Sequence, residues 1–199
     1  MRIVDTPADE RGTPALTLAR IEERLRAHAP LPLPVPDGVT RAAVLVLLRD
    51  GPEGPEILLT QRSHDVRDHK GQVSFPGGAA EDSDADPTAT AVREAAEEVG
   101  LDPAAVRMVG RLDDYVTITN YHVTPVVAFG AFDGLSARTD EITDVFPFPL
   151  AFMADPSHVE RAPGAGMGRK EDILFVQFGD PFVWGATARI LNNLLEIVT

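Results

Sequence analysis

The chain has 199 residues, 44% of them apolar, which is an ordinary composition for a folded domain with a full core. Its formal net charge of −13 argues against broad nucleic-acid binding, because such binding needs a basic field that neutralises phosphates. No apolar run approaches the ~18 residues that cross a bilayer, the N-terminus lacks the apolar core of a secretory signal, and there is no cysteine to form disulfides. We therefore expect a cytoplasmic protein that binds neither nucleic acid nor membrane.

Residues 1–36 are predicted to form a peripheral helix followed by a connector. Thr13-Pro14 can cap and begin this helix, because apolar residues recur at helical spacing behind it. These apolar positions are Leu18, Ile21 and Leu25. The prolines from Pro30 to Pro36 favour an extended connector, and residues 37–199 are expected to form the main domain.

Strand patterns fill the middle of the chain. Residues 42–48, AAVLVLL, are typical of a buried strand, and RDGPEGP supplies a turn into a partner strand at 57–62. Further strands are predicted at 72–75, 107–112, 122–129 and 172–178. Residues 186–198 repeat apolar side chains at helical spacing and predict an amphipathic helix. One helix within the strands and one at the end favour an α/β protein, a mixed sheet between helices in an α/β/α sandwich.

Residues 77–101, GGAAEDSDADPTATAVREAAEEVGL, place a glycine pair before a helix crowded with carboxylates. If residues 88–99 are helical, Glu94, Glu97 and Glu98 fall on one face. These carboxylates repel one another, and Mg²⁺ or Mn²⁺ suits them best because both prefer carboxylate and carbonyl oxygens. Arg93 can orient one of the glutamates through a bidentate pair. Alone, such a run more often marks a solvated acidic surface, so the neighbouring sequence decides.

Gly78 followed by REAAEEVGL at 93–101 resembles the Nudix box, the metal-binding loop–helix–loop of hydrolases that cleave nucleoside diphosphates linked to another moiety. Fourteen residues separate Gly78 from Arg93, one more than in the usual pattern, and an acidic loop at 81–86 replaces an early glutamate. Residues 58–84, LLTQRSHDVRDHKGQVSFPGGAAEDSD, resemble the extended signature of the coenzyme A pyrophosphatase branch. Further similar segments lie at 115–129, 141–150 and 183–191.

The resemblance implies the Nudix fold and hydrolysis of coenzyme A to 4′-phosphopantetheine and adenosine 3′,5′-bisphosphate, with Mg²⁺ or Mn²⁺ as cofactor. The implied metal ligands are the Gly77 carbonyl and the carboxylates of Glu94, Glu97 and Glu98. A general base is also needed, and Glu141 and Glu97 are the two candidates. The catalytic set is then Arg93, Glu97, Glu98 and Glu141. The signature adds four substrate-binding candidates, which are Arg62, Arg67, His69 and Gln72.

Several alternatives stay open. The chain could hydrolyse another nucleoside diphosphate derivative, such as ADP-ribose, or a nucleoside triphosphate, or it could be a non-catalytic nucleotide-binding module. Arg62 and Arg67 could instead form structural ion pairs with Asp65 and Asp68. Trp184 is more typical of a packing anchor than of a platform for adenine. A homodimer and the preferred form of coenzyme A, free, acylated or oxidised, also stay open.

Overall fold

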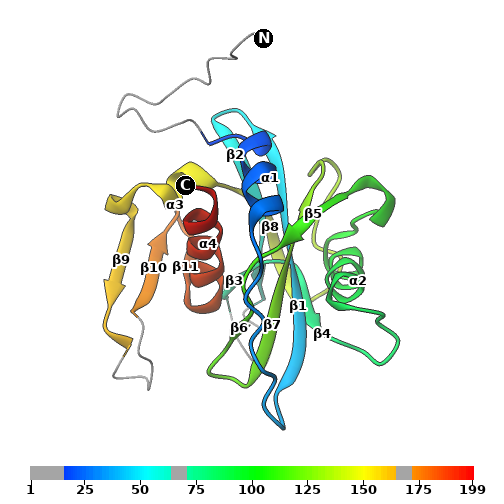
Figure 1. Cartoon of the computed structure of the whole chain (residues 1–199). Helices are drawn as coiled ribbons and strands as arrows, with labels where there is room; N and C mark the ends of the chain where they lie inside the picture. The colour runs from blue at the N-terminus through cyan, green and yellow to red at the C-terminus, as the bar shows by residue number, and fades with distance from the viewer. Residues whose placement is uncertain (1–15, 64–70, 165–171) are drawn as a thin grey trace, which may run out of the picture.

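The computed structural model describes residues 16–63, 71–164 and 172–199, and places a mixed sheet between helices (Figure 1). The helices are α1 (Leu18–Ala27), α2 (Pro87–Val99), α3 (Leu150–Ala154) and α4 (Gly185–Val198), with 3-10 turns η1 (Pro103–Ala105) and η2 (Pro156–His158). The strands are β1 (Thr40–Gly51), β2 (Gly54–Arg62), β3 (Val73–Ser74), β4 (Gly77–Ala79), β5 (Arg107–Arg111), β6 (Tyr115–Val116), β7 (Tyr121–Phe129), β8 (Ile142–Pro149), β9 (Val159–Ala162), β10 (Ile173–Gln177) and β11 (Phe182–Trp184). This arrangement confirms the predicted α/β class and the mixed sheet flanked by helices.

In the main sheet, the neighbouring strands β1 and β2 separate from each other beyond their turn. Strands β1 and β7 run parallel, and β1 and β2 form the predicted antiparallel hairpin. The hairpin pairs only near its turn, from Leu48↔Ile57 to Gly51↔Gly54. Farther along, β1 pairs with β4 and β2 pairs with β3. The chain between β3 and β4 therefore crosses from one central strand to the other and carries the glycine pair into the sheet.

Each face of the main sheet has its own hydrophobic core. Helix α2 covers one face, where small buried residues such as Ala91 and Ala95 meet Leu45 and Leu47 of β1. Helices α1 and α4 cover the other face, and long aliphatic side chains such as Leu191 and Leu194 fill a larger core there. The alternation of β1 explains both cores, because its successive side chains point to opposite faces.

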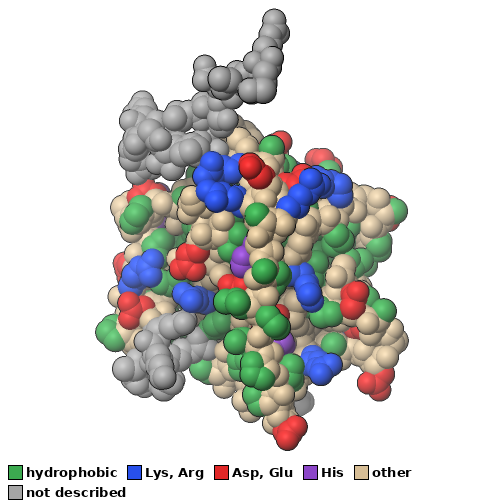
Figure 2. Space-filling model, viewed as in Figure 1, with side chains coloured by type: hydrophobic (Ala, Val, Ile, Leu, Met, Phe, Trp, Pro, Cys, Tyr) green, Lys and Arg blue, Asp and Glu red, His purple; other side chains and the backbone are tan. Residues whose placement is uncertain are grey.

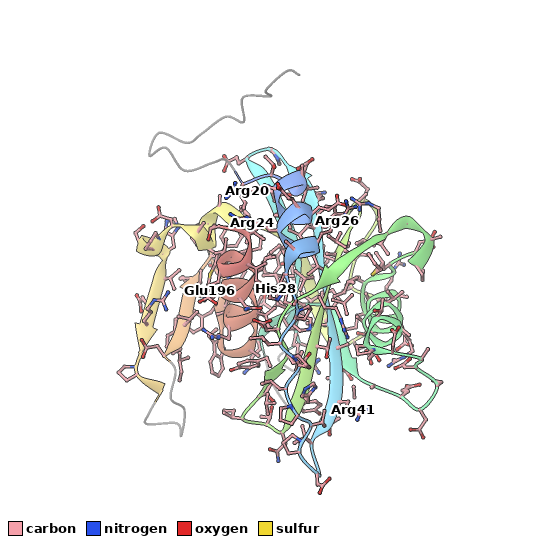
Figure 3. All side chains as sticks on the ribbon, viewed as in Figure 1. Arg20, Arg24, Arg26, His28, Arg41 and Glu196 are labelled. Carbon is pink, nitrogen blue, oxygen red and sulfur yellow. The ribbon has the colours of Figure 1, made fainter. Side chains whose placement is uncertain are left out.

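Helix α1 begins later than predicted. The hydroxyl of Thr17 caps it by accepting a hydrogen bond from the Arg20 N–H at 3.2 Å, and the first helical residue is Leu18. Leu16 and Thr17 are not helical, and the predicted start at Thr13-Pro14 lies outside the described part of the chain. The Arg20 guanidinium donates to the Val198 carbonyl at 3.2 Å, which ties α1 to the end of α4 (Figure 3).

The connector after α1 runs along the surface of the sheet, without helix or strand from residue 28 to 36. Apolar side chains gather along it, with Leu31 65% and Leu33 40% exposed (Figure 2). A groove of about 500 Å³ lies between the connector, the β6 region and α4. It belongs to the α1 and α4 face of the sheet.

The sequence patterns did not predict three features that complete the fold. Strand β8 pairs with almost the whole length of β2. Strands β9, β10 and β11 form a separate three-stranded sheet beside α4 (Figure 1), of which only β10 was predicted. Helix α3 connects β8 to this second sheet region. Within the described residues, no helix is long and apolar enough to cross a membrane.

Candidate functional site

Helix α2 is fixed at both ends by residues suited to those positions. The Asp86 carboxylate caps its start by accepting from the Ala89 N–H at 3.0 Å, and Pro87 occupies the first turn. Gly100 ends it in the left-handed conformation, with φ of 75°. The small buried residues of its apolar side allow the helix to pack closely on the sheet. The last turns of α2 are therefore held in a fixed position against β4.

Glu98 is the buried carboxylate of the site. Its side chain points toward the sheet, and its Oε2 accepts a hydrogen bond from the Gly77 N–H at 3.1 Å. Burial raises the pKa of Glu98 to about 7, against the lowering effect of this N–H. Gly77 has no space for a side chain, because a Cβ there would lie 2.5 Å from the Ala43 carbonyl oxygen. The glycine thus lets the loop approach both the strand and the carboxylate.

Glu94 lies against Gly78. A Cβ on Gly78 would come within 2.6 Å of the Glu94 carboxylate, so this glycine leaves the space that Glu94 occupies. Burial raises the pKa of Glu94, and the Arg93 guanidinium partly offsets this effect by donating to Oε1 at 3.0 Å. Gly77 is therefore required by close backbone contacts, and Gly78 leaves room for the flexible end of Glu94, so neither glycine only forms a turn.

Arg93 joins the acidic loop to α2. Its guanidinium donates to both carboxylate oxygens of Asp84, at 3.1 and 3.0 Å, and to the Ala79 carbonyl at 2.9 Å. These Arg93 hydrogen bonds hold the pKa of Asp84 well below its usual range. Arg93 was predicted to orient a glutamate through a bidentate pair; its bidentate pair is instead with Asp84, and it reaches Glu94 through a single hydrogen bond. The role of Asp84 was missed, and so was that of Asp86, although an Asp-Pro pair before a helix is a recognisable cap.

Glu97 lies apart from the other two glutamates. Its side chain is 60% exposed and forms an ion pair with Arg93 at 3.5 Å. Within residues 16–63, 71–164 and 172–199, no three acidic or histidine side chains are close enough together to hold a metal ion. The predicted cluster of three carboxylates on one face is thus not assembled in this structure: Glu98 is buried, Glu94 is half-buried and Glu97 points toward solvent.

Arg62 and Glu141 meet at the edge of the site. Arg62 Nη2 donates to Glu141 Oε2 at 2.8 Å, and both charges act on Glu98 with opposite effects on its pKa. The buried Nε of Arg62 has no hydrogen-bond partner among the described residues. The Arg62 N–H donates to the Gln72 carbonyl at 2.9 Å, which places Gln72 beside the pair. Arg67 and His69, and the alternative partners Asp65 and Asp68, lie outside the described residues.

The donor set of this site fits a hard divalent cation. A buried carboxylate with one N–H donor among the described residues carries a charge that lacks compensation, and a second carboxylate lies beside the glycine pair. Carboxylate and backbone carbonyl oxygens are the ligands that Mg²⁺ and Mn²⁺ prefer. Gly77, Glu94 and Glu98 supply these ligand types at one end of α2.

Comparisons with known proteins agree with the fold. A model of the NUDIX domain matches residues 39–163. "Uncharacterized Nudix hydrolase NudL" from Escherichia coli (strain K12) is 42% identical in an alignment of 158 residues that covers 77% of this chain and 80% of that protein. The protein with the same printed name from Shigella boydii serotype 18 has the same identity and coverage. The chain therefore belongs to the Nudix hydrolase family.

A solved structure supports the fold alone. The MutT/nudix family protein from Enterococcus faecalis superposes with a TM-score of 0.51 over 92% of this chain and 70% of that chain, at 15% sequence identity. The predicted Nudix fold, with its mixed sheet and flanking helices, is thus confirmed.

Proposed function

We propose that this Nudix hydrolase cleaves the diphosphate of coenzyme A, or of a coenzyme A derivative, with Mg²⁺ or Mn²⁺ as cofactor. The products are 4′-phosphopantetheine and adenosine 3′,5′-bisphosphate. The observation that carries the proposal is the buried Glu98 carboxylate, held against Gly77 and next to the Arg62–Glu141 pair. The choice of coenzyme A rests on the signature at residues 58–84, which includes Arg62, Gln72 and Gly77.

In this proposal Gly77, Glu94 and Glu98 hold the cation, and Glu97 joins them as a fourth ligand. The bound ion would neutralise phosphate oxygens and lower the pKa of a water molecule. Hydrolysis joins the water oxygen to one phosphorus and breaks the bond from that phosphorus to the bridging oxygen. Glu141 is the proposed general base that accepts the proton of the water; it lies at the edge of the site, with its side chain 61% exposed and paired with Arg62 at 2.8 Å. Arg93 keeps Glu94 in place.

Arg62 has a separate role in binding the substrate. The chain has a net charge of −13, so a diphosphate is not attracted to it at long range. Local cations must therefore hold the anion, and a guanidinium suits phosphate because its donors fork bidentately. The Arg62 side chain is 25% exposed at the edge of the site, where its guanidinium can reach an anion beside Glu141. Arg67, His69 and Gln72 complete the proposed substrate-binding set.

The test is product identification from a panel of diphosphates with added Mg²⁺ or Mn²⁺. The panel contains coenzyme A, its acylated and disulfide forms, dephospho-coenzyme A, ADP-ribose and nucleoside triphosphates, and Glu98→Gln serves as the inactive control. We expect the highest kcat/KM for a coenzyme A compound. A higher value for ADP-ribose or a triphosphate would assign the substrate to that compound instead. Binding without hydrolysis of any compound would indicate a non-catalytic module.

A further inference from the structure

A row of aromatic rings lies on the outer face of the second sheet. Phe175 of β10 is directly opposite Trp184 of β11, with ring centroids 6.5 Å apart and planes 10° from parallel. The ring of Phe182 also stacks with that of Phe175, with centroids 5.9 Å apart and planes 19° from parallel. The alternating residues of both strands, Leu174, Val176 and Val183, are buried against α4. The three aromatic rings therefore point away from the core.

This aromatic row, Phe175, Phe182 and Trp184, is partly open to solvent. Phe182 is 43% exposed, and Phe175 and Trp184 are half-buried. A tryptophan that served only to anchor α4 would be expected inside the core, where Val183 lies instead. Exposing large aromatic rings to water is unfavourable, so a group of them on one face of a small sheet indicates a surface that binds a ligand.

The aromatic row is joined to the candidate active site through β3. Strand β11 lies next to β3 (Figure 1), and the buried hydroxyl of Thr187 donates to the Val73 carbonyl at 2.9 Å. The preceding carbonyl, of Gln72, accepts from the N–H of Arg62 at 2.9 Å. Strand spacing and rise then put the backbone of Arg62 on the order of 10 Å from the backbone of Trp184. This span is comparable to that between the base and the diphosphate of an extended adenine nucleotide.

We propose that the aromatic row is the stacking platform for the heteroaromatic base of the diphosphate substrate. This inference rests on the proposed function and names the part of the protein that holds the base half of the substrate. A base presents a flat π-face that stacks on aromatic side chains whatever its substituents. It is also neutral, so the acidic character of the chain does not oppose its binding. Arg62, near one end of β3, then meets the phosphates while the row near β11 meets the base.

The fluorescence of Trp184 tests the platform directly, because Trp184 is the only tryptophan in the chain. The full-length protein is titrated without metal, first with adenosine 3′,5′-bisphosphate and then with 4′-phosphopantetheine, which has no base. We expect a saturable decrease in fluorescence with the first compound and none with the second. No change with either compound, or equal changes with both, would overturn the proposal.

Steady-state kinetics on variants provide the second test. Phe182→Leu is the main variant, because the exposed ring of Phe182 contributes little to stability. Two further variants are compared with each other: Trp184→Leu removes the aromatic π-face, and Trp184→Phe keeps one. We expect KM to rise about 10-fold in the two leucine variants with kcat nearly unchanged. Trp184→Phe should recover most of the affinity. Melting temperatures show that each variant is folded.

A matched control distinguishes the aromatic row from exposed apolar surface in general. Ile118 is 59% exposed and lines the groove beside the connector, so Ile118→Ala removes a similar apolar side chain elsewhere. Its KM should equal that of the wild type, and an increase as large as that of Phe182→Leu would contradict the platform. The proposed function is tested separately. If the protein hydrolyses coenzyme A but its Trp184 fluorescence does not change on binding, only the platform is refuted. A fluorescence response without hydrolysis refutes only the catalytic proposal.

Discussion

The two faces of the main sheet differ in how they hold a carboxylate: Asp113 is half-buried and has several hydrogen-bond partners, whereas Glu98 is buried and has few. On the α1 and α4 face, Asp113 accepts hydrogen bonds from the Leu31 N–H and the Asn193 amide at 2.9 Å each, and lies 2.9 Å from His28 Nε2. On the α2 face, Glu98 accepts from the Gly77 N–H among the described residues. Although burial favours a higher pKa for both, these partners lower the pKa of Asp113, whereas the pKa of Glu98 is raised to about 7.

This difference separates a structural carboxylate from a functional one. Asp113 joins the connector, α4 and the end of α1, and its partners compensate its charge within the protein. Glu98 lacks comparable partners, and a fold that needed only packing would place an aliphatic side chain there, as in the rest of that core. The face with the uncompensated carboxylate is therefore the one that needs a bound cation.

The largest expected effect comes from Glu98→Gln. The amide keeps the shape of the side chain but removes the ligand charge, so kcat should fall by about two orders of magnitude or more at saturating Mg²⁺. The metal-free variant should be at least as stable as the wild type, because an uncompensated buried charge has been removed. Activity assays and thermal melts measure both effects. Glu196→Gln, an exposed change on α4, is the control, and full activity in a folded Glu98→Gln protein would contradict the site.

A smaller effect is expected from Gly78→Ala. The added methyl group would lie 2.6 Å from the Glu94 carboxylate, and this carboxylate is the end of a flexible side chain that can move away. We expect the Mg²⁺ concentration for half-maximal activity to rise about 10-fold, the order of effect seen when groups that position metal ligands are changed. Gly110→Ala is the matched control, because its nearest atom would be 3.7 Å away. An unchanged Mg²⁺ requirement would exclude Glu94 as a ligand.

Mg²⁺ should also stabilise the folded protein. A cation that binds the native state alone adds about 2.7 kcal/mol at 100 times its Kd, which raises the melting temperature of a chain of this size by roughly 5 °C or more. Scanning calorimetry with and without Mg²⁺ measures the shift. The shift should be much smaller in Glu98→Gln, and its absence in the wild type would argue against a cation site on α2.

Elements with a strong local pattern were predicted from the sequence better than the rest of the molecule. Strands β1 and β7, the box helix and α4 were found because their apolar residues follow one local period. Strand β8 was missed because Pro147 and Pro149 argue against a strand, yet an edge strand tolerates proline where its N–H would face away from its partner. Strands β9 and β11 are short and owe their existence to pairing with β10.

The same limits apply to the candidate site. Glu98 and Gly77 belong to one continuous motif, so a pattern of nearby residues is enough to pair them. The Arg62–Glu141 pair joins residues 79 positions apart and depends on the pairing of β2 with the unpredicted β8. The exposure of Glu97 could not be read from helical spacing either, because that spacing fixes the face of a residue but not how far the neighbouring loops cover it.

The smallest expected effect comes from a change at Asp113. Its pKa is lower in the folded protein than in the unfolded chain, so the ionised carboxylate stabilises the fold. This contribution is fully present above the unfolded value of about 3.9 and is lost as the pH falls through the folded value. Asp113→Asn should therefore lower the free energy of unfolding by about 1–3 kcal/mol at neutral pH, the usual contribution of hydrogen bonds to a charged group. The difference from the wild type should shrink below about pH 4.

Urea unfolding of both proteins across this pH range measures the difference, with the exposed Asp133→Asn as the control. Asp113→Asn should leave kcat unchanged, because Asp113 belongs to the α1 and α4 face and stabilises the connector rather than the cation site. Glu98→Gln and Asp113→Asn thus have opposite expected signs: one loses activity and keeps stability, and the other loses stability and keeps activity. If Asp113→Asn were as stable as the wild type at neutral pH, the hydrogen bonds to Asp113 would not stabilise its charge. Asp113 and Glu98 would then not differ in the way proposed.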